Sequence, residues 1–194
     1  MSPILGIWAS AQQNALQTAF DSIQTVTVGA GGQSTISFTS IPSTYKHLQI
    51  RAMSRSNYGG TSGGIENYIR VGNGSVDSGS NYAYHEAGGN GSTARSGGAA
   101  SQNKSILGYS PRSGDLANTF GVYVSDILDY SDTNKNKTIR SLAGHNMNTT
   151  SDGDVELFSG LWMSTAAINT IDIFPIPGYN FTQYSTFALY GIKG

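Results

Sequence analysis

Apolar and polar positions alternate along most of the chain after residue 22. In residues 47–54, Leu48, Ile50 and Ala52 share one face while the intervening side chains share the other. This period of two is typical of a half-buried β-strand. Similar runs are separated by clusters of Gly, Asn, Ser and Asp, which favour turns. The pattern predicts strands at residues 23–28, 34–39, 47–54, 65–71, 81–86, 104–109, 120–128, 137–145, 156–163, 170–174 and 187–192.

The spacing of these runs indicates an all-β fold. Short strands with turn signals about every 8–12 residues are typical of a β-sandwich or barrel, and we expect a jelly-roll-like sandwich. Residues 23–28 and 34–39 flank the turn signal at residues 29–32, which predicts a hairpin. The stretch at residues 88–102 contains five glycines and is expected to be the longest loop.

The alternating sets also predict which side chains form the core. Each chosen residue belongs to a run whose intervening positions are polar or small, so that one face of the strand is expected to be buried. The expected core residues are Leu48, Ile50, Ile69, Val71, Val122, Val124, Ile139, Leu161, Ile171, Ile173, Phe187 and Leu189.

The first ten residues form an apolar peptide ahead of this polar, glycine-rich body. The peptide is too short to span a bilayer, which needs about 20 apolar residues. No Lys or Arg precedes it, as would be expected in a signal peptide. An exposed apolar segment is costly in water, so we expect it to dock on another protein or to add a strand to its own domain. The expected attachment residues are Ile4, Leu5, Ile7 and Trp8, with Trp8 as the anchor.

Residues 11–20 are the only favourable helix-forming stretch, and they could form a short amphipathic helix between the peptide and the sandwich. The expected domain organisation is therefore an N-terminal attachment arm at residues 1–20 and a β-sandwich domain at residues 21–194. A chain of 194 residues suits one such domain, because domains commonly hold about 100–200 residues.

Charge is scarce in this chain. Only 12% of the residues are charged, against about 25% in ordinary globular proteins. The net charge of −1 gives no electrostatic attraction to nucleic acid or to an anionic membrane, so neither is an expected partner. A neutral, hydroxyl-rich surface suits contacts between subunits, and we expect a homotrimer. The absence of cysteine excludes disulfides and thiolate chemistry.

No catalytic or metal-binding motif stands out, and no cofactor is expected. The three histidines, at positions 47, 85 and 145, have no second ligand at metal spacing. The acidic residues cluster around 126–132 and 152–156, and calcium binding by either group stays open. A glycan-cleaving enzyme, the least favoured function, would need two carboxylates about 5–10 Å apart. The candidates for such a pair are Asp126, Asp129, Asp152 and Asp154.

Tyrosine is the most suggestive residue type for ligand binding. Tyrosine beside Asn and Ser can stack on a sugar ring and donate a hydrogen bond to it. Sandwiches also bury tyrosines at strand ends, so a structural role is the alternative. The tyrosines near loop-rich segments are Tyr58, Tyr68, Tyr82, Tyr84, Tyr109, Tyr123 and Tyr130, and the candidate ligand-binding residues among them are Tyr58, Tyr82 and Tyr84.

Five segments together resemble a family of small virion structural proteins of tailed bacteriophages, of the capsid-decoration or tail-fibre type. The terminal segments are moderately specific, and the central ones are those of a generic β-protein. The segments are residues 3–10 (PILGIWAS), 41–51 (IPSTYKHLQIR), 81–85 (NYAYH), 127–130 (ILDY) and 187–192 (FALYGI).

The resemblance implies a non-enzymatic component of the virion, synthesised in the host bacterial cytoplasm and homotrimeric. Its partners would be other virion proteins of the capsid or the tail, reached through the N-terminal peptide. The alternative, from another functional class, is a tail-fibre receptor-binding module that recognises host surface glycans. The resemblance leaves open whether the protein lies on the head or on the tail.

Overall fold

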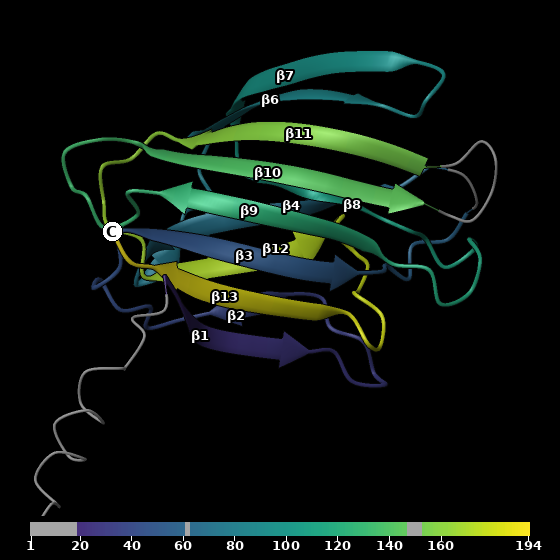
Figure 1. The fold of residues 1–194 in the computed structure, drawn as a ribbon, viewed down its shortest axis with the longest axis horizontal. Coiled ribbons are helices and arrows are strands. Elements are labelled where there is room, and N and C mark those ends of the chain that lie inside the picture. Colours follow the sequence, from purple (N-terminus) through teal and green to yellow (C-terminus); the bar gives the residue numbers. More distant parts are fainter. Residues whose placement is uncertain (1–18, 61–62, 147–152) are drawn as a thin grey trace, which may run out of the picture.

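The computed structural model describes residues 19–60, 63–146 and 153–194, which form two packed antiparallel sheets (Figure 1). Each element in these ranges is a strand, as the alternating pattern predicts. The strands are β1 (Phe20–Thr27), β2 (Ile36–Phe38), β3 (His47–Ser54), β4 (Ile65–Asn73), β5 (Ser75–Val76), β6 (Tyr82–Gly89), β7 (Ala94–Gln102), β8 (Ser105–Ser110), β9 (Gly121–Leu128), β10 (Lys137–Asn146), β11 (Gly153–Trp162), β12 (Thr170–Pro175) and β13 (Thr186–Ile192).

Eight of these strands have the topology of a jelly roll. One sheet contains β1-β13-β3-β9, and the other contains β2-β12-β4 with β8 on the free edge of β4. When the eight are numbered 1 to 8 along the chain, the orders are 1-8-3-6 and 2-7-4-5. These are the two interleaved four-stranded sheets of a jelly roll. The predicted fold class is therefore confirmed.

Two insertions widen only one of the sheets. The connection between β4 and β8 contains the hairpin β6–β7, and the connection between β9 and β12 contains β10–β11. All four strands extend the first sheet beyond β9, in the order β9-β10-β11-β6-β7. Figure 1 shows this eight-stranded large sheet in front and the small sheet behind its central strands. The small sheet therefore covers only part of the inner face of the large one.

The core lies between the sheets and contains nine of the twelve residues expected there, each at most 1% exposed. In β3, for example, Leu48 and Ile50 point inward while Gln49 and Arg51 point outward. The confirmed core residues are Leu48, Ile50, Ile69, Val71, Ile139, Ile171, Ile173, Phe187 and Leu189.

The prediction is wrong for β9. Val122 and Val124 are 54% and 43% exposed, and Tyr123, Ser125 and Ile127 point into the core instead. The strand carries apolar side chains on both faces, so its pattern fits either register, and a shift of one residue exchanges the faces. Contacts with the other sheet select the inner face.

The third misplaced core residue is in β11. Leu161 is only half-buried, because the alternation in this strand places Phe158, Gly160 and Trp162 inward.

The interior also contains a seam of hydroxyl and amide groups. Ser54 and Ser110 hydroxyls are 2.7 Å apart, and both accept hydrogen bonds from the Asn67 amide. Ser125 and Ser141 hydroxyls make a second 2.7 Å contact. Buried polar groups are costly unless they are hydrogen-bonded, and these pairs satisfy each other. Part of the serine content predicted for the surface therefore belongs to the core.

The predicted hairpin at residues 23–28 and 34–39 is wrong. β1 pairs with β13 and β2 pairs with β12, so the two strands belong to different sheets. The turn itself forms, since the Gly32 amide donates to the Gly29 carbonyl over 3.0 Å. A local turn signal identifies a change of direction but not the sheet that the chain joins next.

The predicted long loop at residues 88–102 contains a strand. Ala94–Gln102 is β7, which pairs with β6 at the edge of the large sheet. Gly, Ala and Ser lack the apolar alternation that marks a strand, so the sequence gives little signal here. The tight turn between the strands is capped by Asn90, whose side chain accepts from the amides of Ser92 and Thr93.

Most of the predicted helix at residues 11–20 lies outside the described residues. Its last residue, Phe20, begins β1. The boundary proposed at residue 20 between arm and sandwich therefore falls at the start of the first strand.

Replacing Ile50 with Ala tests the packing of the core. Ile50 is fully buried between β13 and β9, so truncation should lower the free energy of unfolding by about 2–5 kcal/mol. The control is Leu116→Ala, because Leu116 is 52% exposed and should change stability by less than about 0.5 kcal/mol. Urea unfolding at one protein concentration measures both. Equal losses would contradict the assignment of the core.

Candidate interaction surfaces

The predicted attachment residues Ile4, Leu5, Ile7 and Trp8 lie outside the described residues. The structure describes where the chain enters the sandwich. The backbone carbonyl of Ala19 accepts from the Lys193 amide over 3.1 Å, and Phe20 is 40% exposed on the edge strand β1. The guanidinium of Arg51 lies 5.2 Å from the centre of the Phe20 ring. The entry point is therefore fixed on the outer side of the large sheet.

The three candidate ligand-binding tyrosines have different environments. Tyr82 is fully buried, and its hydroxyl contacts backbone groups of Val71 and Asp77, so it cannot contact a surface ligand. Tyr84 is half-buried on the inner side of β6. Tyr58 is half-buried beside Tyr179, with the ring centres 4.6 Å apart. The structure therefore retains Tyr58 and Tyr84 as candidates and removes Tyr82.

Tyr179 lines a groove beside the outer face of the small sheet, which we call the aromatic groove. Its volume is about 350 Å³. Arg70 comes from β4, Asp172 and Phe174 come from β12, and the loops before β2 and after β12 complete the rim. The lining residues are Ser34, Thr35, Arg70, Asp172, Phe174, Pro175, Pro177, Gly178 and Tyr179.

Cationic and aromatic side chains are interleaved at this groove. Arg70 lies 5.0 Å from the centre of the Phe174 ring and donates to the Asn103 carbonyl over 2.9 Å. Phe174 also contacts Tyr68, its cross-strand neighbour, at 5.8 Å between ring centres. Lys104 lies 4.5 Å from the Tyr68 ring. These contacts hold the aromatic rings in place at the surface.

The groove presents both ring faces and hydrogen-bonding groups. The Asp172 carboxylate accepts from the Ser37 hydroxyl over 2.6 Å, which fixes its orientation beside Arg70. An aromatic surface flanked by a carboxylate, a guanidinium and hydroxyls can stack on a sugar ring and bind its hydroxyls. The sequence did not single out Phe174 or Tyr179. Phe174 comes close to Arg70 through the pairing of β12 with β4, which are distant in the chain, and Tyr179 lies in the loop that follows β12.

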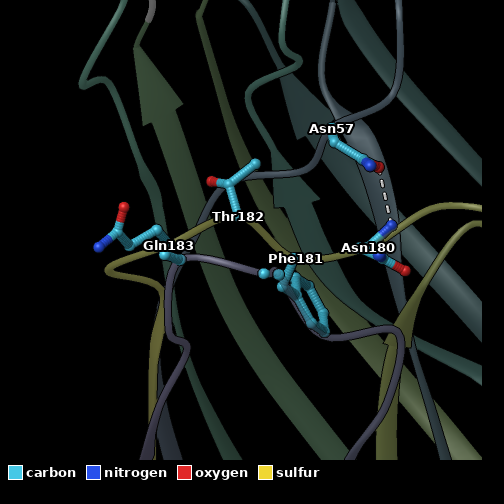
Figure 2. Close-up of a pocket in the computed structure, with 8 residues that line it drawn as sticks. Asn57, Asn180, Phe181, Thr182 and Gln183 are labelled. Atoms are coloured by element: carbon cyan, nitrogen blue, oxygen red, sulfur yellow. Dashed lines mark hydrogen bonds between the residues drawn. The ribbon is translucent and has the colours of Figure 1, made fainter.

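A second, smaller pocket lies among the loops at one end of the sandwich. Its volume is about 280 Å³. Figure 2 shows Asn57 and Asn180 joined on one side of it, with Gln183 on the other. The Asn180 amide donates to the Asn57 side chain over 2.8 Å. The lining is neutral and polar, so it offers hydrogen bonds without a charged group.

The large sheet has an exposed apolar surface on its outer side, which we call the outer apolar face. Its members are 40–64% exposed and belong to four adjacent strands. They occupy paired positions, since Val124 lies opposite Leu142 and Leu142 lies opposite Leu157. The face consists of Met53, Val122, Val124, Leu142, Val155 and Leu157.

The acidic residues considered for catalysis or calcium binding contact cationic side chains. Asp126 lies 3.1 Å from Arg140. Asp129 lies 2.7 Å from Lys135, and the hydrogen bond from Lys135 holds the pKa of Asp129 below its ordinary value. Asp152 lies outside the described residues. Within the described ranges, no group of three His, Cys, Asp or Glu side chains could hold a metal ion.

A charged cluster joins β7, β10 and β11 on the inner side of the large sheet. Arg95 contacts Asp154 at 2.8 Å and also contacts Glu156, which is almost fully buried. His145 lies 3.9 Å from Asp154. His47 and His85 lie elsewhere, on β3 and β6. The arrangement anchors the hairpin β6–β7 to β11 through ion pairs.

Two buried cations organise the loops. The Arg55 guanidinium donates to the carbonyls of Leu116, Thr119 and Asp115 and so shapes the connection before β9. The Lys137 ammonium is fully buried and donates to three carbonyls, of residues 132, 135 and 165. Burial lowers the pKa of Lys137. Neither residue had a sequence signal, because hydrogen bonds to backbone carbonyls leave no pattern of residue types in the sequence.

Titration of Tyr68 tests the environment of the aromatic groove. Burial, with help from the nearby Glu66 carboxylate, raises the pKa of Tyr68 to about 12. Ultraviolet absorbance measures the formation of phenolate during a pH titration of the wild-type protein and of Tyr68→Phe. The part of the signal that the substitution removes should therefore appear around pH 12 rather than near pH 10. Because the pKa of Tyr68 is higher in the folded protein than in the unfolded chain, Tyr68 contributes to the free energy of unfolding below about pH 10. This contribution is lost as the pH rises through 12. A signal near pH 10 would contradict this geometry.

Comparison with protein-family models gives no match, and comparison with curated proteins gives no match either. In the described ranges, no helix is long and apolar enough to cross a membrane.

Proposed function

We propose that this protein is a non-enzymatic structural component of a tailed-phage virion, mounted through its N-terminal peptide and assembled as a homotrimer. It would be synthesised in the host bacterial cytoplasm and would contact other virion proteins of the capsid or tail. The sequence resemblance at both ends of the chain supports this function. So does the low charge, since charged residues are depleted from the centres of subunit interfaces.

The observation that carries the proposal is the strand content of the sandwich. All eight jelly-roll strands come from the chain between Phe20 and Ile192. The eight strands that define the jelly roll therefore do not include the apolar peptide around Ile4, Leu5, Ile7 and Trp8. In this proposal the peptide binds another protein, with Trp8 as its anchor, since Trp is frequent at the energetic centres of interfaces.

Deleting residues 1–10 tests the mounting function. The truncated protein should keep its thermal stability, because the strands of the jelly roll are retained, and should no longer be incorporated into virions. Trp8→Ala should reduce incorporation by about tenfold or more, as loss of an interface anchor does. Gln12→Ala is the matched control and should be incorporated normally. Immunoblots of purified virions and thermal unfolding measure the two effects. A truncated protein that melts at a clearly lower temperature would contradict the proposal.

The second candidate function is recognition of host surface glycans, and the aromatic groove favours it. The groove combines Phe174 and Tyr179 with Arg70 and Asp172, which suits a sugar ring and its hydroxyls. Tyr58 would support the site through its contact with Tyr179. Such a protein would be a receptor-binding module of a tail fibre.

Glycan-array binding tests this second function. Tyr179→Ala should weaken binding of any glycan recognised by the wild-type protein by about tenfold, the effect of losing one stacking contact. Tyr184→Ala is the control, because Tyr184 is also exposed but does not line the groove. The absence of any bound glycan on the array, or equal effects of the two variants, would contradict glycan recognition in this groove.

A further inference from the structure

The outer apolar face is continuous across the large sheet. Two rows of outward residues cross it, one through Val124, Leu142 and Leu157 and the other through Met53, Val122 and Val155. Gly144 lies between Val122 and Val155 in the second row and has no side chain, so the surface is lower there than at its two neighbours. Thr186 and Ala188 border the face on β13. A contiguous apolar surface of this kind is typical of an interaction site.

The charged groups beside this face are hydrogen-bonded to neighbouring side chains of the same subunit. Arg51 donates to the Gln49 side chain over 2.7 Å, and Gln49 donates to Asp126 over 2.8 Å. Asp126 also accepts from Arg140. Arg51 further lies 4.9 Å from the centre of the Tyr190 ring. The partner therefore meets one ion pair, Asp126–Arg140, and one cation, Arg51, held over an aromatic ring, so a largely neutral apolar surface fits the face best.

The face is open in the described part of the chain. Figure 1 shows the large sheet at the front, with its labelled strands uncovered on that side. The small sheet packs on the opposite side of the large sheet. The apolar side chains in question therefore have no cover from any described element.

The outer side of the sheet is wide enough for a subunit contact centred on this face. A contact that also included the bordering strands β13 and β6 would cross six strands, about 29 Å at 4.8 Å spacing, and eight residues of strand, about 26 Å. The product, roughly 750 Å², is close to the roughly 800 Å² per partner of a standard interface. Its apolar centre and polar border also match the usual anatomy of an interface.

We propose that the outer apolar face packs against a second copy of this chain. This face would be the surface through which the proposed homotrimer forms. The inference rests on the proposed function only in that the protein assembles with copies of itself. A second copy is the partner whose composition fits, because the chain is nearly neutral and the charged groups beside this face are hydrogen-bonded within their own subunit. The association buries side chains that one subunit leaves in water.

Leu142→Glu in the full-length chain tests the proposal. Leu142 is 59% exposed near the centre of the face, so the carboxylate should not disturb the core but should be costly to bury. The wild-type protein should be an oligomer at micromolar concentration, and Leu142→Glu should raise the dissociation constant by at least about a hundredfold. Leu116→Glu is the matched control, being 52% exposed outside the face, and should leave the mass unchanged. Analytical ultracentrifugation measures all three.

A wild-type monomer at tens of micromolar, or equal masses for Leu142→Glu and wild type, would overturn the proposal. This outcome leaves the mounting function intact, which is tested separately by incorporation into virions.

A spin label identifies what covers the face. The chain has no cysteine, so Leu142→Cys and Leu116→Cys each provide a single labelling site. The label at position 142 should be immobilised and should become mobile on dilution below the dissociation constant, whereas the label at 116 should be mobile throughout. A label at 142 that is mobile at every concentration would overturn the proposal. So would one that stays immobilised in the monomer and is freed by deleting residues 1–10, because the N-terminal segment would then be the occupant.

Discussion

The close approach of β8 to β10 and β11 decides which side chains the large sheet can bury. A Cβ atom on Gly108 would lie 2.7 Å from the Cβ of Ala143, and one on Gly160 would collide with the Ser105 hydroxyl. Gly108, Ala143, Gly160 and Ser105 are small enough for this close approach, and the Ser141 hydroxyl uses it to donate to the Leu107 carbonyl. Leu142 of β10 and Leu157 of β11 point to the opposite side of the sheet, where they form part of the outer apolar face.

This packing explains where prediction from the sequence succeeded and failed. β3 was predicted with its observed bounds, because its apolar and polar residues alternate without ambiguity. In β9 the sequence offered Val122 and Val124 on one face and Tyr123 and Ile127 on the other, and hydrophobicity cannot choose between them. The choice depends on contacts between strands far apart in the chain, such as the hydrogen-bonded pair of Ser125 and a serine of β10.

The candidate binding surfaces were harder to predict than the strands for a similar reason. Phe174 and Tyr68 are more than a hundred residues apart in the sequence, yet they are cross-strand neighbours beside the aromatic groove. The criterion of a tyrosine near Asn and Ser selects Tyr58, which lies at the border of the aromatic groove. It also selects Tyr82, whose hydroxyl is hydrogen-bonded to backbone groups and is not accessible to a ligand. Composition identifies residue types suited to a ligand, but strand pairing decides which of them share a surface.

The architecture separates the two candidate surfaces. Arg70 and Phe174 point away from the core on the small sheet, whereas Val124 and Leu142 point away from it on the large sheet. The outer faces of the two sheets of a sandwich lie on opposite sides of a core about 10 Å thick. A subunit packed on the large sheet would therefore leave the aromatic groove accessible. Self-association and ligand recognition are compatible in one molecule, and substitutions at Leu142 and Tyr179 should affect them independently.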